Sequence, residues 1–159
     1  ASEVHQNALY VYGGMDAESQ VLGDLWKFDF QSCQWNRIHS LAPVFGHRMV
    51  SVGSNLNDPL WMIVGGVYQD GRCSQKPFVI RKERSSNADQ FEVCEFDAAF
   101  DGDINSFHND WFSFGAAVCA HTSASNGSHI YSSGGGGGLF SFGHCFNSHP
   151  SKIAIKNCF

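Results

Sequence analysis

The chain has 159 residues, enough for one domain with a hydrophobic core. Hydrophobic residues make up 43% of the sequence, which argues against disorder, and the net charge of −5 disfavours direct binding of nucleic acid. Seventeen glycines and 14 phenylalanines favour short strands joined by tight turns over long helices. No apolar segment approaches the roughly 20 residues that a membrane-spanning helix needs. We therefore expect an all-β protein without a membrane span.

The N-terminal segment predicts a strand that ends in two glycines. Residues 9–12 are all β-favouring, and Gly13 and Gly14 would allow a positive φ and close packing on a neighbouring sheet. Residues 1–7 are too few for a full preceding strand, so we expect the first strand of this unit to be missing. Residues 15–23 are expected to form a polar loop.

Two tryptophans mark the strands that complete this first unit. Residues 25–28, which include Trp26, predict the third strand, and residues 35–38, which begin with Trp35, predict the fourth. We interpret both tryptophans as packing residues between adjacent sheets.

A second unit follows the same order with a less regular second half. Residues 45–52 predict its first strand, and residues 61–64 predict a second strand that runs into another glycine pair. Residues 67–90 are interpreted as an enlarged loop in which 78–80 add a short extra strand. Residues 92–97 are expected to be the third strand, and the fourth is unassigned.

A third unit repeats the spacing of the second. Gly46 lies 19 residues before Gly65, and Gly115 lies 19 residues before Gly134. Further strands are expected at 117–120, 130–131 and 152–155. When the units are aligned on their glycine pairs, two sets of strand positions coincide: Leu9 with Trp61 and Ile130, and Tyr10 with Met62 and Tyr131.

This repeated order resembles the kelch repeat, the four-stranded blade of a β-propeller. The resemblance implies an all-β partial kelch β-propeller of about three antiparallel blades, at residues 1–43, 44–108 and 109–159. The positions that carry the repeat are Gly13, Gly14, Trp26, Trp35, Gly46, Gly65, Gly66, Gly115, Gly134 and Gly135.

Residues 134–147 resemble, more narrowly, the end of the kelch region in the tRNA wybutosine-synthesising protein 4 family. That resemblance implies a parent protein with an S-adenosylmethionine-dependent methyltransferase domain that modifies phenylalanine tRNA. The chain itself would be a scaffold or substrate-positioning segment that touches tRNA only indirectly, and it would hold no cofactor. Alternatives are a general kelch interaction module, such as a ubiquitin-ligase substrate adaptor, and a relative of the kelch-type copper oxidases.

No catalytic residue and no metal ligand can be assigned from the sequence. The eight histidines do not follow a zinc spacing, no nucleophile elbow precedes a helical pattern, and the oxidase copper set is not recognisable. The run at 134–138 lacks the lysine of a phosphate loop. Six cysteines without paired spacing indicate reduced thiols in a cytoplasmic protein, whose partners would be another protein or further propeller blades.

Overall fold

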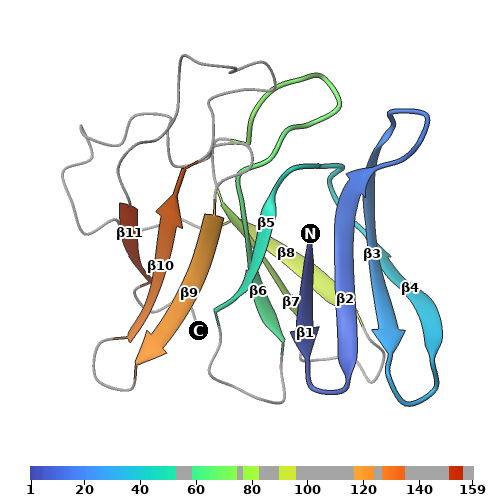
Figure 1. Ribbon diagram of the computed structural model, residues 1–159, viewed down its shortest axis with the longest axis horizontal. Coiled ribbons are helices and arrows are strands. Elements are labelled where there is room, and N and C mark those ends of the chain that lie inside the picture. Colours follow the sequence, from blue (N-terminus) through green and yellow to red (C-terminus); the bar gives the residue numbers. More distant parts are fainter. Residues whose placement is uncertain are drawn as a thin grey trace.

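The computed structural model describes seven segments of the chain, and within them it contains strands, turns and no helix. The strands form three antiparallel sheets (Figure 1). The expectation of an all-β chain built from antiparallel blades is therefore confirmed. The described residues are 1–52, 59–74, 77–82, 90–95, 117–123, 127–134 and 151–155.

Sheet 1 contains four strands, so the prediction that its first strand is missing was wrong. The strands pair in sequence order: β1 (Ser2–His5), β2 (Ala8–Met15), β3 (Val21–Asp29) and β4 (Gln34–Ser40). The first strand is only four residues long and largely polar, and it reverses directly into β2 through a turn in which Gln6 has a φ of 51°. A short polar strand at the inner edge lacks the apolar alternation by which strands are recognised. The β2–β3 loop is also shorter than the polar segment expected at 15–23.

Sheet 2 corrects the second half of the second unit. Its order is β5 (Arg48–Ser51), β6 (Leu60–Val64), β7 (Phe78–Lys82) and β8 (Phe91–Glu95). The segment expected as an extra strand inside a loop is the third strand β7, and the segment expected as the third strand is the fourth, β8. The interior position of β7 follows from its buried Val79 and Ile80, which face opposite sides of the sheet.

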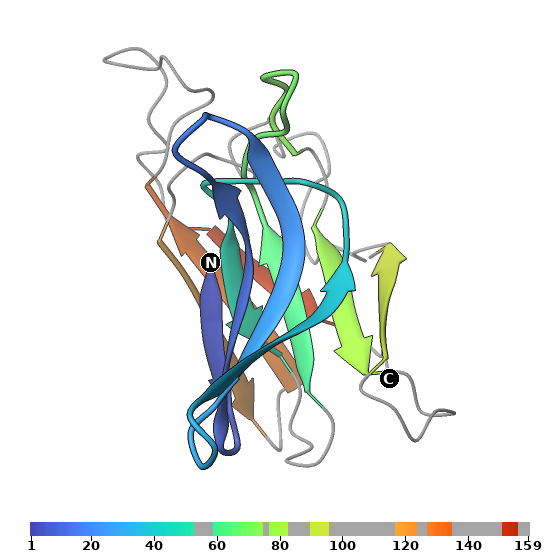
Figure 2. The same ribbon diagram turned by 90° about the vertical axis from the view of Figure 1, so that its right-hand side faces the viewer.

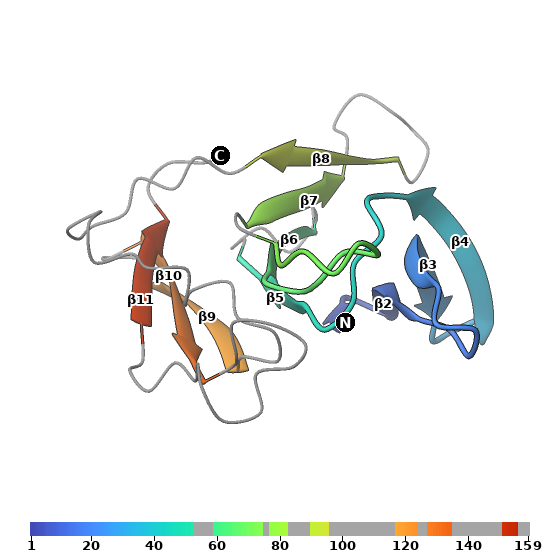
Figure 3. The same cartoon turned by 90° about the horizontal axis from the view of Figure 1, so that it is seen from above.

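Sheet 3 confirms the strands predicted in the third unit. Its described strands are β9 (Ala117–Ser123), β10 (Gly127–Ser133) and β11 (Ser151–Ile155), with β10 in the middle. Viewed from above, the three sheets fan out from β1, β5 and β9, with sheet 2 between the other two (Figure 3). The blade boundaries near 43 and 108 stay a prediction, because residue 108 lies outside the described residues.

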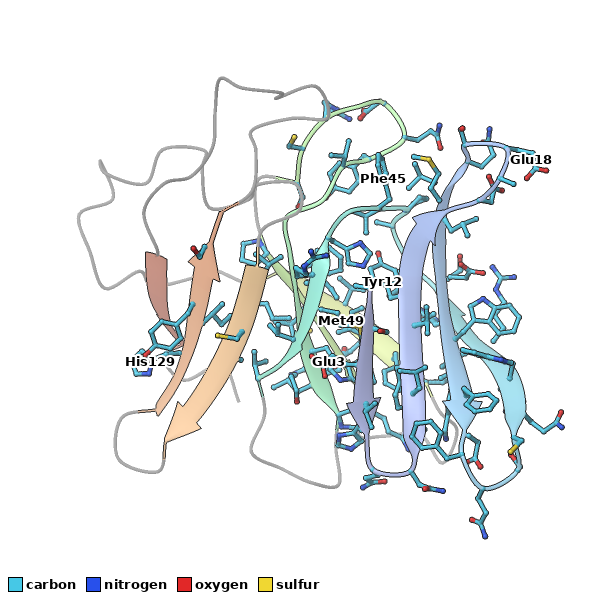
Figure 4. All side chains as sticks on the ribbon, in the orientation of Figure 1. Glu3, Tyr12, Glu18, Phe45, Met49 and His129 are labelled. Carbon is cyan, nitrogen blue, oxygen red and sulfur yellow. The ribbon has the colours of Figure 1, made fainter. Side chains whose placement is uncertain are left out.

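Strand alternation divides the apolar side chains between two interfaces. Along β5, Met49 packs toward sheet 1 and Val50 packs toward sheet 3, as successive strand residues must point to opposite faces. Figure 4 shows Tyr12 and Met49 between β2 and β5. The first interface joins Ala8, Tyr10, Tyr12 and Leu25 to Met49, Trp61, Ile63, Ile80 and Phe91. The second joins Val50, Val52, Leu60, Met62, Val64 and Val79 to Val118, Ala120 and Ile130.

Trp61 is the aromatic centre of the first interface. Its indole is fully buried, lies 4.6 Å from the ring centroid of Tyr10, and stacks on Phe91 at 5.6 Å. Because Tyr10 belongs to β2 and Phe91 to β8, these ring contacts reach from the second strand of sheet 1 to the last strand of sheet 2. Offset and tilted ring contacts of this kind add to the stability supplied by buried area.

We predict that Trp61→Ala lowers the free energy of unfolding by about 3–5 kcal/mol, the usual cost of removing a large aromatic side chain from a packed core. Urea unfolding followed by circular dichroism measures this change. Trp35→Ala is the control, because the Trp35 side chain is 51% exposed and its loss is expected to cost less than about 1 kcal/mol. Equal losses in the two variants would contradict the assignment of Trp61 to the interface.

Candidate functional site

The linker between sheets 1 and 2, residues 41–47, is hydrogen-bonded to both sheets. On the sheet 1 side, the Gly14 N–H donates to the Val44 carbonyl at 2.9 Å. On the sheet 2 side, the amides of Phe45 and Val67 donate to each other's carbonyls at 3.1 and 2.9 Å. The linker is therefore tied by backbone hydrogen bonds to both sheets, close to their two glycine pairs, and Phe45 forms an isolated β-bridge with Val67.

Two glycines make this close approach possible. A Cβ on Gly13 would lie 2.4 Å from the Val44 carbonyl oxygen, and a Cβ on Gly66 would lie 2.7 Å from Val44 Cγ2 and 2.8 Å from His47 Cβ. Both residues also have left-handed backbones, with φ of +58° and +97°. A side chain at either position would be strained in its own backbone and would collide with the linker.

The side chain of Tyr12 packs against that of His47, the last residue of the linker. The Tyr12 hydroxyl donates to the Ala42 carbonyl, and burial raises the pKa of Tyr12. The ring of His47 lies 5.0 Å from that of Tyr12 and is 2% exposed. Neither His47 ring nitrogen has a hydrogen-bond partner within the described residues. Burial is the main cause that lowers the pKa of His47 to about 3, and the positive charge of the N-terminus adds to this effect. His47 is therefore neutral over the whole range in which exposed histidines titrate.

Two loops from neighbouring sheets lie together at one end of the molecule, at the top in Figure 1. We call this surface the loop end and define it as residues 15–20, the last residue of β2 with the β2–β3 loop, and 67–74, which follow β6. The Val21 N–H donates to the Gln69 side-chain carbonyl at 2.6 Å, which ties the second loop to the first. The loop end is thus one surface built by two sheets.

Each loop of the loop end is held in shape by an aspartate. Asp16 accepts hydrogen bonds from the amides of Glu18 and Gln20 at 3.1 and 2.8 Å, in a turn typical of aspartate. Asp70 accepts from the Arg72 amide at 3.0 Å and pairs with its guanidinium at 2.6 Å. These bonds, the backbone one first, lower the pKa of Asp70. The loops are therefore ordered by their own polar groups.

The outer surface of the loop end is exposed and carries polar and apolar groups side by side. Met15 is 45% exposed, and Glu18, Gln69 and Asp70 are also exposed. Figure 4 places Glu18 at the tip of the β2–β3 loop and Phe45 nearer the second loop. An ordered, exposed and chemically mixed surface built by loops on a rigid scaffold is suited to contact with another macromolecule.

Those predicted glycines that the structure describes lie next to the linker or at equivalent strand ends. Gly14, Gly46 and Gly65 have φ of 117°, 66° and 68°, and Gly134, at the end of β10, has a φ of 74°. The positive φ expected at the first glycine pair is therefore observed. Gly115 and Gly135 lie outside the described residues.

Trp26 and Trp35 lie on the face of sheet 1 that points away from sheet 2. Trp26 stands opposite Val11, and its indole N–H donates to Asp24 at 2.6 Å. The half-exposed Trp35 packs on Phe28 at a centroid distance of 5.0 Å. Their described contacts thus lie within sheet 1, so packing between sheets stays a prediction for both.

Sequence reasoning missed the residues that fill the first interface, above all Trp61, Tyr12 and His47. The available signal was the alignment of the glycine pairs, which puts Trp61 at the same strand position as Ile130. Both are fully buried on the face toward the preceding sheet. Aligned apolar positions therefore reveal which face of each blade meets its neighbour.

Tests for metal, disulfide and membrane-spanning features were made on the described segments alone. These segments contain no group of three residues of the metal-ligating types that could hold an ion. None of their four cysteines forms a disulfide. They also contain no helix with the length and hydropathy that a membrane crossing requires.

We predict that Gly66→Ala destabilises the chain by clearly more than Gly71→Ala. Both glycines have a positive φ, of +97° and +82°, but a Cβ on Gly71 would meet nothing within 4 Å. Gly71→Ala therefore reports the backbone strain alone, about 1–3 kcal/mol, and Gly66→Ala adds the collision with the linker. Urea unfolding of both variants measures the difference. Equal losses of unfolding free energy would show that the linker moves aside without a measurable cost, and would contradict the prediction.

We predict a loss of stability as the pH falls from about 6.5 toward 3, caused by His47. In this window the unfolded chain binds a proton at His47 and the folded chain does not, so protonation favours unfolding. The contribution approaches about 1.4 kcal/mol per pH unit. His47→Gln should flatten the dependence of the unfolding free energy on pH, whereas His39→Gln, at an exposed position, should retain it. An unchanged slope in His47→Gln would contradict the prediction.

Comparison with known proteins agrees with the geometry of sheet 1. A family model described as the kelch motif matches residues 1–41, which cover all four strands of that sheet. No curated protein matches the chain. Sheets 1 and 2 share their strand order and their glycine pair, and sheet 3 repeats the central strands. Residues 1–41 match the kelch motif, and the described sheets have the fold of a partial kelch β-propeller.

Proposed function

We propose that this chain is a protein-binding scaffold that contacts its partner through the loop end. The observation that carries the proposal is the hydrogen bond between the Val21 amide and the Gln69 side chain, because it makes one surface from loops of two sheets. The internal bonds of Asp16 and Asp70 support it further, since a preformed surface loses little conformational entropy on binding. The kelch motif at residues 1–41 agrees with a scaffold of this type.

We predict that Glu18→Lys weakens capture of the partner by at least tenfold. The Glu18 side chain is exposed at the tip of the loop end, so the charge reversal should leave the fold intact and change only the surface. The measurement is quantitative mass spectrometry of proteins that the tagged chain captures from cells. Gln31→Lys is the matched control, because Gln31 is exposed in the β3–β4 turn at the opposite end of sheet 1. A partner lost with Gln31→Lys and retained with Glu18→Lys would overturn the proposal.

We further propose, on the resemblance of residues 134–147, that the scaffold belongs to a cytoplasmic S-adenosylmethionine-dependent methyltransferase that modifies the wybutosine of phenylalanine tRNA. The acidic net charge of −5 supports indirect contact with tRNA, because a direct interface would need a basic surface. No residue of this chain is assigned to the cofactor. The second candidate is a ubiquitin-ligase substrate adaptor, which the loop end would suit equally well.

Cells that lack this protein separate the two candidates. The methyltransferase proposal predicts phenylalanine tRNA that accumulates an undermethylated precursor in place of the mature base, measured by nucleoside mass spectrometry. Normal levels of the mature base would reject the link to wybutosine and leave the scaffold proposal in place. Capture of ubiquitin-ligase subunits, lost in Glu18→Lys, would then favour the adaptor.

A further inference from the structure

Asp70 and Gly71 form a sequence pair whose covalent chemistry differs from its role in shaping the loop end. In an Asp–Gly pair the glycine nitrogen can attack the aspartate Cγ, because glycine has no side chain to hinder the approach. The N–Cγ bond forms, the amide proton and the carboxyl OH leave together as water, and a five-membered succinimide results. Water then adds to one of the two ring carbonyls. One opening restores aspartate, and the other gives isoaspartate, in which the main chain runs through the former side-chain carboxyl.

The pair lies in residues 67–74, the part of the loop end that follows β6. Figure 2 shows this segment in green at the top of the molecule, beside the β2–β3 loop. The Asp70 side chain is 47% exposed, and a Cβ built on Gly71 would meet nothing within 4 Å in the described part of the chain. Solvent water therefore reaches Asp70, and no described side chain crowds the glycine.

Hydrogen bonds engage both of the groups that would react. The Gly71 N–H, whose proton must leave, donates to the Tyr68 carbonyl at 3.0 Å. Asp70 Oδ1 accepts from the Arg72 amide at 3.0 Å, and Asp70 Oδ2 accepts from the Arg72 Nε at 2.6 Å. The Arg72 amide, and then its side chain, lower the pKa of Asp70. Because an ionised carboxylate is a poor electrophile, these contacts oppose closure of the succinimide ring.

We propose that Asp70–Gly71 is a site of isoaspartate formation and that Arg72 is the positioning residue that slows the reaction in the folded chain. The Arg72 side chain is 82% exposed, so its contact with Asp70 is one that solvent and motion can break. Each time it breaks, the carboxyl group is free to take up a proton and turn toward the Gly71 nitrogen. The site is therefore slowed rather than blocked.

Isomerisation would change the loop end where its two loops meet. Isoaspartate moves one carbon atom from the side chain into the main chain, so the carboxylate no longer reaches Arg72 with the present spacing. Gln69, the residue directly before the pair, accepts the Val21 N–H through its side chain at 2.6 Å. We expect the lengthened main chain to displace Gln69 and break this hydrogen bond. Any effect on a partner rests on the proposed function, whereas the modification itself does not.

The test is the rate at which isoaspartate forms at Asp70 in the folded 159-residue chain at neutral pH. Mass spectrometry of proteolytic peptides, with fragmentation that separates isoaspartate from aspartate, measures this rate. Arg72→Ala should raise it by about two- to fivefold, the factor that corresponds to the loss of one exposed ion pair. Arg72→Lys should keep most of the protection, because it retains a positive charge beside the carboxylate. Arg37→Ala, at an exposed position on β4, is the matched control and should leave the rate unchanged.

A second Asp–Gly pair in the sequence, Asp101–Gly102, provides an internal reference in every sample. Arg72→Ala should accelerate the reaction at Asp70 and leave the rate at Asp101 as it was. Equal rates at Asp70 in the unchanged chain and in Arg72→Ala would overturn the proposal. An equal rise at both pairs would overturn it too, because it would show a general loosening of the chain. Circular dichroism of each variant confirms that the fold is retained during the measurement.

Discussion

The close approach of the linker to two pairs of glycines is the constraint on which the arrangement of sheets 1 and 2 depends. Val44 lies between Gly13 and Gly66, so close to both that a Cβ at either position would collide with it. The hydrogen bonds of Gly14 to Val44 and of Val67 to Phe45 then hold the linker to both sheets. Because the approach fixes where β5 begins, it also fixes which faces of the two sheets meet.

Burial of the Tyr12 and His47 side chains at the linker makes this junction costly to open. The Tyr12 hydroxyl donates a hydrogen bond to the Ala42 carbonyl in the linker. The His47 ring remains neutral, and neither of its nitrogens has a hydrogen-bond partner within the described residues. Leaving a polar ring unpaired in a core carries a free-energy cost, which the surrounding apolar packing must offset. The junction therefore links stability to pH through one histidine that is remote from the loop end.

The sequence predicted the class and the repeat of this fold better than its strand assignments. Regular spacing located the glycine pairs, because positive φ values recur where each second strand meets a linker. The short strand β1 was missed because a polar edge strand carries no apolar alternation. Strand β7 was taken for part of a loop because tryptophan landmarks at β3 and β4 have no counterpart in sheet 2. Trp61 was overlooked for a related reason: nothing in its local sequence distinguishes an interface side chain from any other apolar strand residue.

The site was less predictable, since it depends on contacts between segments far apart in the chain. The hydrogen bond from the Val21 amide to the Gln69 side chain joins residues 48 positions apart in the sequence, and no local sequence pattern predicts it. A scaffold whose loops act as one surface requires that sheets 1 and 2 move and unfold as one body. Native-state hydrogen exchange measures this directly. We expect the amides of Gly14, Phe45 and Val67 to exchange only by the global unfolding that also exposes β2 and β6. Exchange of these three amides at a much lower opening free energy, with β2 and β6 still protected, would show that the linker does not join the sheets.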